Sequence, residues 1–218
     1  MSFEIDHDQR IENCENFMAQ DIEARFAQVI SALETAADWP FVRPESLDSE
    51  AIRRAYNAKR PADEQLDATW FANQFANMDL INILDILTPE ARIEIFPECL
   101  EGEKDEGRVY RDLWLEFFAH AKVPLSADDI TLSVIEDDPD YADQNGLAFS
   151  FDGNAYEFYY DRGSSYLDTS VFNDFNDFAL AAGLETGIVH DEFNDHAAGG
   201  YVLPMSAVRL LDPFRPPY

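Results

Sequence analysis

The spacing of the apolar residues changes its period part-way along this 218-residue chain. Up to about residue 122 they recur every three or four positions, which is typical of helices with one buried face. From Ile130 onward apolar and polar residues alternate, which is typical of strands with one buried face. We therefore expect an α+β protein with a helical part over 1–122 and an α+β part over 123–218, the two sharing one core.

Helices are expected at five places in the first part. Apolar spacing marks their buried faces, and Pro residues or capping side chains mark their ends. The predicted helices are a long one from Ile11 that ends at Trp39-Pro40, a short one capped by Ser49, one over 63–87, a short one that begins at Thr88-Pro89, and one that ends near Ala121.

A β-hairpin is predicted around Asp152-Gly153, a residue pair that favours a two-residue type I′ turn. That turn sets the register, and the register places the large apolar side chains on one face. The expected cross-strand pairs are Phe151 with Asn154, Phe149 with Tyr156, and Leu147 with Phe158, beside a third strand near Ile130–Val134.

A covering helix is predicted after the hairpin. Residues 168–170 serve as its cap, its apolar stripe faces the hairpin, and Gly183 ends it in the left-handed conformation. Weaker strands near 186–190 and 200–203 and a short helix from Ser206 are expected to complete a mainly antiparallel sheet, on which the N-terminal helices pack.

Negative charge is the strongest functional signal in the composition. The chain has 44 acidic and 15 basic residues, a net charge of −29, and residues 123–218 hold only Arg162, Arg209 and Arg215 against 18 acids. Such a surface repels nucleic acid and anionic lipid, whereas it speeds encounter with a basic protein. An acidic surface also favours solubility, so charge alone does not establish binding.

The chain offers no apolar run long enough for a membrane span and no N-terminal secretory signal, and we expect a cytoplasmic protein. Its two cysteines, Cys14 and Cys99, lack a Cys-x-x-Cys spacing. We find no nucleophile elbow and no Gly-rich phosphate loop, and we expect no enzyme activity and no cofactor.

Two acidic segments are candidate sites. The connection that carries Asp137, Asp138, Asp140 and Asp143 matches a calcium loop poorly, because Tyr141 falls at its first ligand position when Gly146 is aligned to the invariant glycine. We interpret it as an exposed acidic loop. The segment over 190–196 holds two histidines and three carboxylates without a known metal-ligand spacing, and we interpret it as a solvated loop.

The outer face of the hairpin is the third candidate. In the predicted register Glu157, Tyr159 and Asp161 point away from the covering helix, with Tyr166 just beyond. Tyrosines among carboxylates are typical of recognition surfaces, where aromatic anchors bind and charges steer the partner. The alternative is that other elements cover this face.

A small, acidic, cofactor-free helix-plus-sheet chain of this kind resembles the immunity proteins that bacteria encode beside polymorphic or secreted toxins. The resemblance lies in overall character and in the strand–strand–helix part from Ile130 to Gly183, and it implies tight binding to a cognate, basic toxin whose active site or substrate path is blocked. Under it the interface residues are Asp138, Asp140, Asp143, Glu157, Tyr159, Asp161, Tyr166, Asp191 and Glu192.

Two alternatives belong to other classes of function. The first is an acidic regulatory adaptor or nucleic-acid mimic that sequesters basic proteins. The second is a metal-dependent enzyme that uses the segment over 190–196, through His190 and His196.

Overall fold

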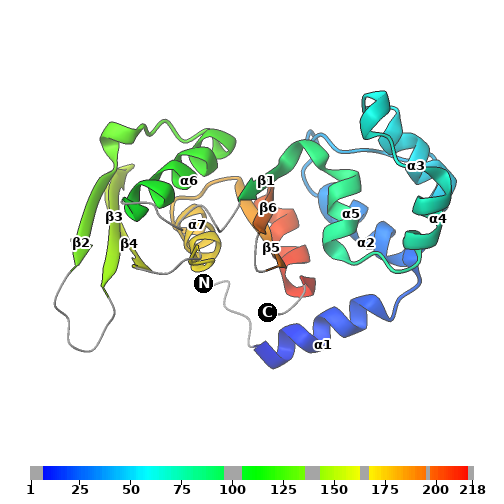
Figure 1. Cartoon of the computed structure of the whole chain (residues 1–218), viewed down its shortest axis with the longest axis horizontal. Helices are drawn as coiled ribbons and strands as arrows, with labels where there is room; N and C mark the ends of the chain where they lie inside the picture. Colours follow the sequence, from blue (N-terminus) through cyan, green and yellow to red (C-terminus); the bar gives the residue numbers. More distant parts are fainter. Residues whose placement is uncertain (1–6, 96–104, 136–142, 163–166, 195–196, 216–218) are drawn as a thin grey trace. The chain divides into compact units, whose positions relative to one another are not determined.

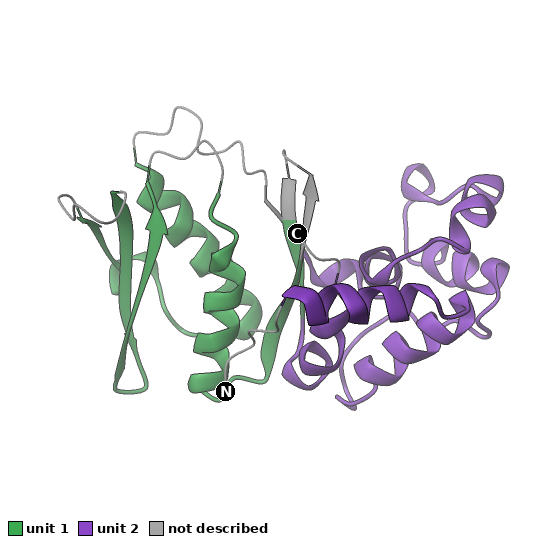
Figure 2. Ribbon diagram, turned by 90° about the horizontal axis from the view of Figure 1, so that it is seen from below, with its two compact units in different colours: residues 1–3, 93–202 green, residues 4–92, 203–218 purple. Residues whose placement is uncertain are grey.

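The computed structural model of the chain describes residues 7–95, 105–135, 143–162, 167–194 and 197–215. The chain is α+β, as expected, with eight α-helices and two antiparallel three-stranded sheets among these residues. It forms two compact units, one of residues 1–3 and 93–202 and one of residues 4–92 and 203–218 (Figure 2). These boundaries differ from the division at 122/123 expected from the apolar period.

The unit of residues 4–92 and 203–218, here called the helical unit, contains helices joined by short loops and 3₁₀ turns. Its α-helices are α1 (His7–Met18), α2 (Ile22–Leu33), α3 (Ser49–Asn57), α4 (Ala68–Phe75), α5 (Leu80–Leu87) and α8 (Met205–Leu211). The largest contacts join α2 to α5 and α8, and α3 to α4. In the described part of the chain, no helix combines the length and the hydropathy that a bilayer span requires.

The long helix expected from Ile11 to Trp39 is two helices, which is a correction to the sequence prediction. The buried face of α1 carries Arg10 and Phe17, while the apolar residues Ile11 and Cys14 are only half-buried. Arg10 pairs with Asp212 across 3.2 Å, and the ring of Phe17 lies 5.7 Å from that of Phe214. Residues distant in sequence therefore determine which face of α1 is buried. The helix ends at Met18, before α2 begins at Ile22.

The helix expected over 63–87 is also wrong as a single element. It consists of a 3₁₀ turn and the separate helices α4 and α5. Asp67 caps α4 by accepting bonds from the N–H groups of Thr69 and Trp70, and Asp79 caps α5 by accepting one from Asn82. Each carboxylate offers a local start for a helix, because it satisfies N–H groups that a helix end leaves unbonded.

The unit of residues 1–3 and 93–202, here called the sheet unit, holds both sheets. It contains α6 (Glu106–Ala121), β2 (Thr131–Ile135), β3 (Gln144–Phe151), β4 (Asn154–Asp161), α7 (Ser170–Ala181), β5 (Thr186–Asn194) and most of β1 (Arg92–Ile95) and β6 (Ala197–Pro204), whose residues Arg92, Leu203 and Pro204 belong to the helical unit. The strand orders are β2-β3-β4 and β1-β6-β5. The single sheet expected from the sequence is thus two sheets, and the helix expected at Thr88-Pro89 is a 3₁₀ turn followed by β1.

The hairpin register is confirmed residue by residue. Phe151 pairs with Asn154, Phe149 with Tyr156, and Leu147 with Phe158. The turn places Asp152 at φ 49° and Gly153 at φ 79°, the left-handed region that a type I′ turn requires. The predicted end of α7 is confirmed too, since Gly183 has a φ of 69°.

Helices α6 and α7 cover one face of the β2-β3-β4 sheet, the inner face (Figure 1). Trp114 of α6 is fully buried at the centre of this layer. Its ring lies 5.4 Å from Phe149, 4.6 Å from Phe158 and 5.7 Å from Phe175. The large apolar side chains of the hairpin therefore pack in the core. The opposite face of the sheet carries mainly smaller and polar side chains.

Candidate protein-binding surface

The outer face of the β2-β3-β4 sheet is the candidate site. Strand pleating places every second residue on it, and the measured register aligns these residues in rows across the three strands. The rows are Thr131, Ala148 and Glu157; Ser133, Gly146 and Tyr159; and Ile135, Gln144 and Asp161, with the pair Ser150 and Ala155 beyond them. Among the described residues of the sheet unit, no helix or strand packs on this face (Figure 1).

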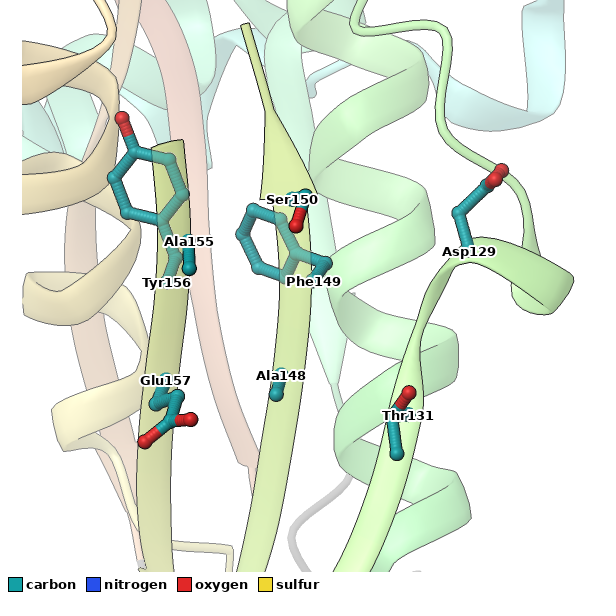
Figure 3. A pocket seen from close by; sticks show the side chains of 8 residues that line it. All are labelled: Asp129, Thr131, Ala148, Phe149, Ser150, Ala155, Tyr156 and Glu157. Atoms are coloured by element: carbon teal, nitrogen blue, oxygen red, sulfur yellow. The ribbon is translucent and has the colours of Figure 1, made fainter. Parts of the chain in front are cut away.

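Small residues of the central strand make the face concave. Ala148 lies between Thr131 and Glu157, and a hollow of about 340 Å³ lies over this row (Figure 3). Asp129 and Glu157 line the hollow on opposite sides, with the carboxyl of Asp129 turned away from the strands (Figure 3). The arrangement is a shallow trough with carboxylates on both banks, whose shape suits a protruding side chain of a partner.

At Gly146, in the next row, side chains of β2 and β4 lean over the central strand. A Cβ on Gly146 would lie 2.3 Å from Ser133 Oγ and 3.4 Å from Cε1 of Tyr159. The tyrosine ring therefore lies against the glycine backbone, and Gly146 is buried although it faces outward. The ring is held in place while 45% of Tyr159 stays exposed.

A hydrogen bond fixes the other end of the Tyr159 side chain. Its hydroxyl donates to Glu157 Oε2 across 2.9 Å, and this bond to the carboxylate raises the pKa of Tyr159. An aromatic side chain fixed before binding loses little conformational entropy when a partner contacts it. Tyr159 is therefore suited to be an anchor of the surface.

Charge on this sheet has one sign. From Val123 to Asp161 the sequence contains ten acidic residues and no Lys or Arg. The sheet unit as a whole holds 25 acidic and five basic residues, a balance of −20, compared with −9 for the helical unit. Hydrogen bonds from the hydroxyl and the N–H of Ser126 lower the pKa of Asp129. The outer face thus presents negative potential with little internal compensation.

The structure describes four of the nine predicted interface side chains. Asp143, Glu157, Tyr159 and Asp161 are all exposed, and the last three lie on the outer face of β4. Asp138, Asp140 and Tyr166 lie outside the described residues. Asp191 and Glu192 belong to β5, and their side chains also lie outside the described part.

The solvated loop expected over 190–196 is wrong for its first residues. Residues 190–194 continue strand β5, and His190 is only 2% exposed, with its ring stacked 4.9 Å from that of Phe172. Within the described ranges no group of three or more His, Cys, Asp or Glu side chains is arranged to hold a metal ion.

Sequence reasoning missed four residues of this surface, namely Asp129, Ile135, Gly146 and Ala148. The last two carry no chemical signal by themselves, because their contribution is the space above a central strand. Ile135 has a side chain that is 38% exposed, and strand alternation assigns it to the outer face once its pairing with Gln144 is known.

Comparison of this chain with models of protein families, with curated proteins and with solved structures finds no match.

Proposed function

We propose that this chain is an immunity protein that binds and neutralises a cognate, basic toxin in the cytoplasm. The observation that carries the proposal is the exposed outer face of the β2-β3-β4 sheet, where Tyr159 and Ile135 stand beside Glu157 and Asp161 in strands without any basic residue. Bacterial origin and the toxin's chemistry belong to the same proposal.

The surface combines apolar contact area with charge, the two features on which protein recognition depends. An exposed, pre-positioned tyrosine supplies apolar contact area, and enrichment in tyrosine is typical of binding hot spots. Uncompensated carboxylates speed encounter with a basic partner and pair with the Lys and Arg side chains that the partner uses for its own substrate. In this proposal the chain acts by occupying the toxin, and none of its residues performs chemistry.

The test is a protection assay with the product of the reading frame next to this gene. Under the proposal, that product kills cells only when this chain is missing, and the purified pair forms a stoichiometric complex. Replacement of Glu157 and Asp161 by lysine slows association and flattens its salt dependence, because both carboxylates are exposed and act through long-range attraction.

The matched control replaces Glu12 and Glu15 by lysine, since both are exposed residues of α1 in the helical unit and give the same change in net charge. An equal loss of association rate in both double variants would show that overall charge acts, not the outer face. Binding of several unrelated basic proteins with modest affinity would instead favour an acidic adaptor or nucleic-acid mimic.

A further inference from the structure

Strand β2 forms one edge of the outer-face sheet. It pairs with β3 over all five of its residues, from Thr131 with Ala148 to Ile135 with Gln144. Among the residues that the structure describes, no strand pairs with the other side of β2. Every second residue of an edge strand turns its backbone N–H and C=O groups outward, so this side offers a row of unpaired donors and acceptors.

The sequence of β2 and its pairing with β3 lack the charges, prolines and bulges by which edge strands block strand addition. Its sequence, Thr-Leu-Ser-Val-Ile, has no charge, no proline and no glycine, and the register with β3 runs without a bulge. Val134 and Ile135 are 48% and 38% exposed, so two β-branched apolar side chains stand at the open edge. Strand β4, at the opposite edge, carries Glu157 and Asp161.

The second sheet of the same unit shows what a closed edge looks like. Strand β5 ends the order β1-β6-β5, and Asn176 of α7 bonds to its backbone. The amide of Asn176 donates to the carbonyl of Ile188 across 2.8 Å and accepts from the N–H of Ile188 across 2.7 Å. A buried side chain therefore takes the place of a neighbouring strand at β5, while β2 has no such partner in the described part of the chain.

We propose that β2 accepts an extended segment of the basic partner, which adds a fourth strand to the sheet through main-chain hydrogen bonds. This inference rests on the proposed function and specifies how the partner docks. Charge decides between the two possible occupants. A second copy of this chain would bring together two units with a balance of −20 each, whereas a basic segment is attracted to the same edge.

The geometry also specifies the sequence of the added strand. Its side chains would alternate between the two faces of the sheet. Those on the outer face would extend the rows at their β2 end, beside Thr131, Ser133 and Ile135, where the negative potential of the sheet favours Lys or Arg. Those on the inner face would lie beside Val134, where an apolar side chain buries exposed surface. Alternating basic and apolar residues are therefore expected in the docking segment.

The test uses two short synthetic peptides in which lysine and valine alternate. The second peptide carries N-methyl groups on every other backbone nitrogen, so that it keeps the charge but loses its donors along one edge. Both are titrated into the full, isotope-labelled chain and followed by amide NMR shifts and hydrogen exchange. The first peptide is expected to protect amides of β2 and to bind at least about tenfold more tightly, since several main-chain bonds are lost in the second.

Equal binding of the two peptides, or shifts confined to β4, would overturn strand addition and leave the acidic outer face as the binding surface. Failure of both peptides to bind at low salt would count against strand addition and against the proposed function together. The outcomes therefore separate the two ideas without any change to the fold of the chain.

Discussion

The indole N–H of Trp114 donates a hydrogen bond to the hydroxyl oxygen of Tyr160 across 2.8 Å, and both side chains are fully buried. The same hydroxyl is hydrogen-bonded to the carboxyl of Asp174. One oxygen thus joins α6, β4 and α7. Tyr160 also stacks on Tyr110, with ring centroids 4.2 Å apart. This buried contact holds β4 in place, and with it the Glu157, Tyr159 and Asp161 side chains on the outer face.

Replacement of Tyr160 by phenylalanine is expected to lower the free energy of unfolding by about 1–3 kcal/mol. The ring still fills its space, but the buried N–H of Trp114 loses its acceptor and the carboxyl of Asp174 loses its bond to the same hydroxyl, and buried groups left unsatisfied carry that cost. Tyr159→Phe is the matched control, because its hydroxyl bonds only to the exposed Glu157, and a change within about 0.5 kcal/mol is expected. Urea unfolding of both variants, followed by circular dichroism, measures the difference. Equal losses would show that the Trp114 bond contributes nothing specific.

The carboxyl of Asp174 should make stability depend on pH. Burial raises the pKa of Asp174 from 3.8 to about 6, the negative charges of Asp168 and Asp177 add to the increase, and the hydrogen bond with Tyr160 opposes it. The folded state then holds the proton more tightly than the unfolded state does. This contribution is present in full below about pH 4 and is lost as the pH rises to about 6.

The variant Asp174→Asn isolates this contribution. Because Asp174 is only part-buried, solvent screens its charge, and a loss of about 1–2 kcal/mol between pH 4 and pH 7 is expected for the wild-type chain beyond that of the variant. Glu116→Gln on the exposed side of α6 should keep the wild-type profile, because the charge of Glu116 does not contribute to the raised pKa of Asp174. Parallel profiles for wild type and Asp174→Asn would contradict the shifted pKa.

The local parts of the fold could be predicted because short-range geometry determines them. The Asp152-Gly153 turn and the alternation of Phe149 and Phe158 fix the hairpin register by themselves, and the outward direction of Glu157 follows from the same parity. The residues of the outer face could therefore be predicted from the sequence. The trough over Ala148 could not, because its shape depends on three strands together.

Long-range partners account for what could not be predicted. The buried face of α1 depends on Asp212, about two hundred residues away, and the apolar spacing of α1 contains no trace of that ion pair. Trp70 lies in an apolar-rich stretch, yet its side chain is 52% exposed. The spacing of apolar residues predicts which side chains share a face, but it does not predict which other element packs on that face.

Replacement of Arg25 is expected to destabilise the helical unit more than replacement of an exposed arginine, because its guanidinium is buried. It donates to the carbonyls of Ala76, across 2.7 Å, and of Met78, both in the segment between α4 and α5. Arg25→Met leaves the carbonyl of the buried Met78 unsatisfied and removes the bond to Ala76, and a loss of about 1–3 kcal/mol in unfolding free energy is expected. Arg43→Met removes an exposed pair with Glu34 and should cost about 1 kcal/mol or less. Similar values for the two variants would show that burial does not set the cost.

Asn176 should matter more than any exposed polar residue of α7. Its amide satisfies the N–H and the C=O of Ile188, and both Asn176 and Ile188 are buried. Asn176→Ala leaves two buried backbone groups without partners, for which a loss of about 2–4 kcal/mol is expected, together with faster hydrogen exchange at the Ile188 amide. Asn173→Ala is the control, since Asn173 is exposed on the same helix. If exchange at Ile188 stayed slow in Asn176→Ala, another group would have to close the edge of β5, and the contrast with the open edge of β2 would lose its basis.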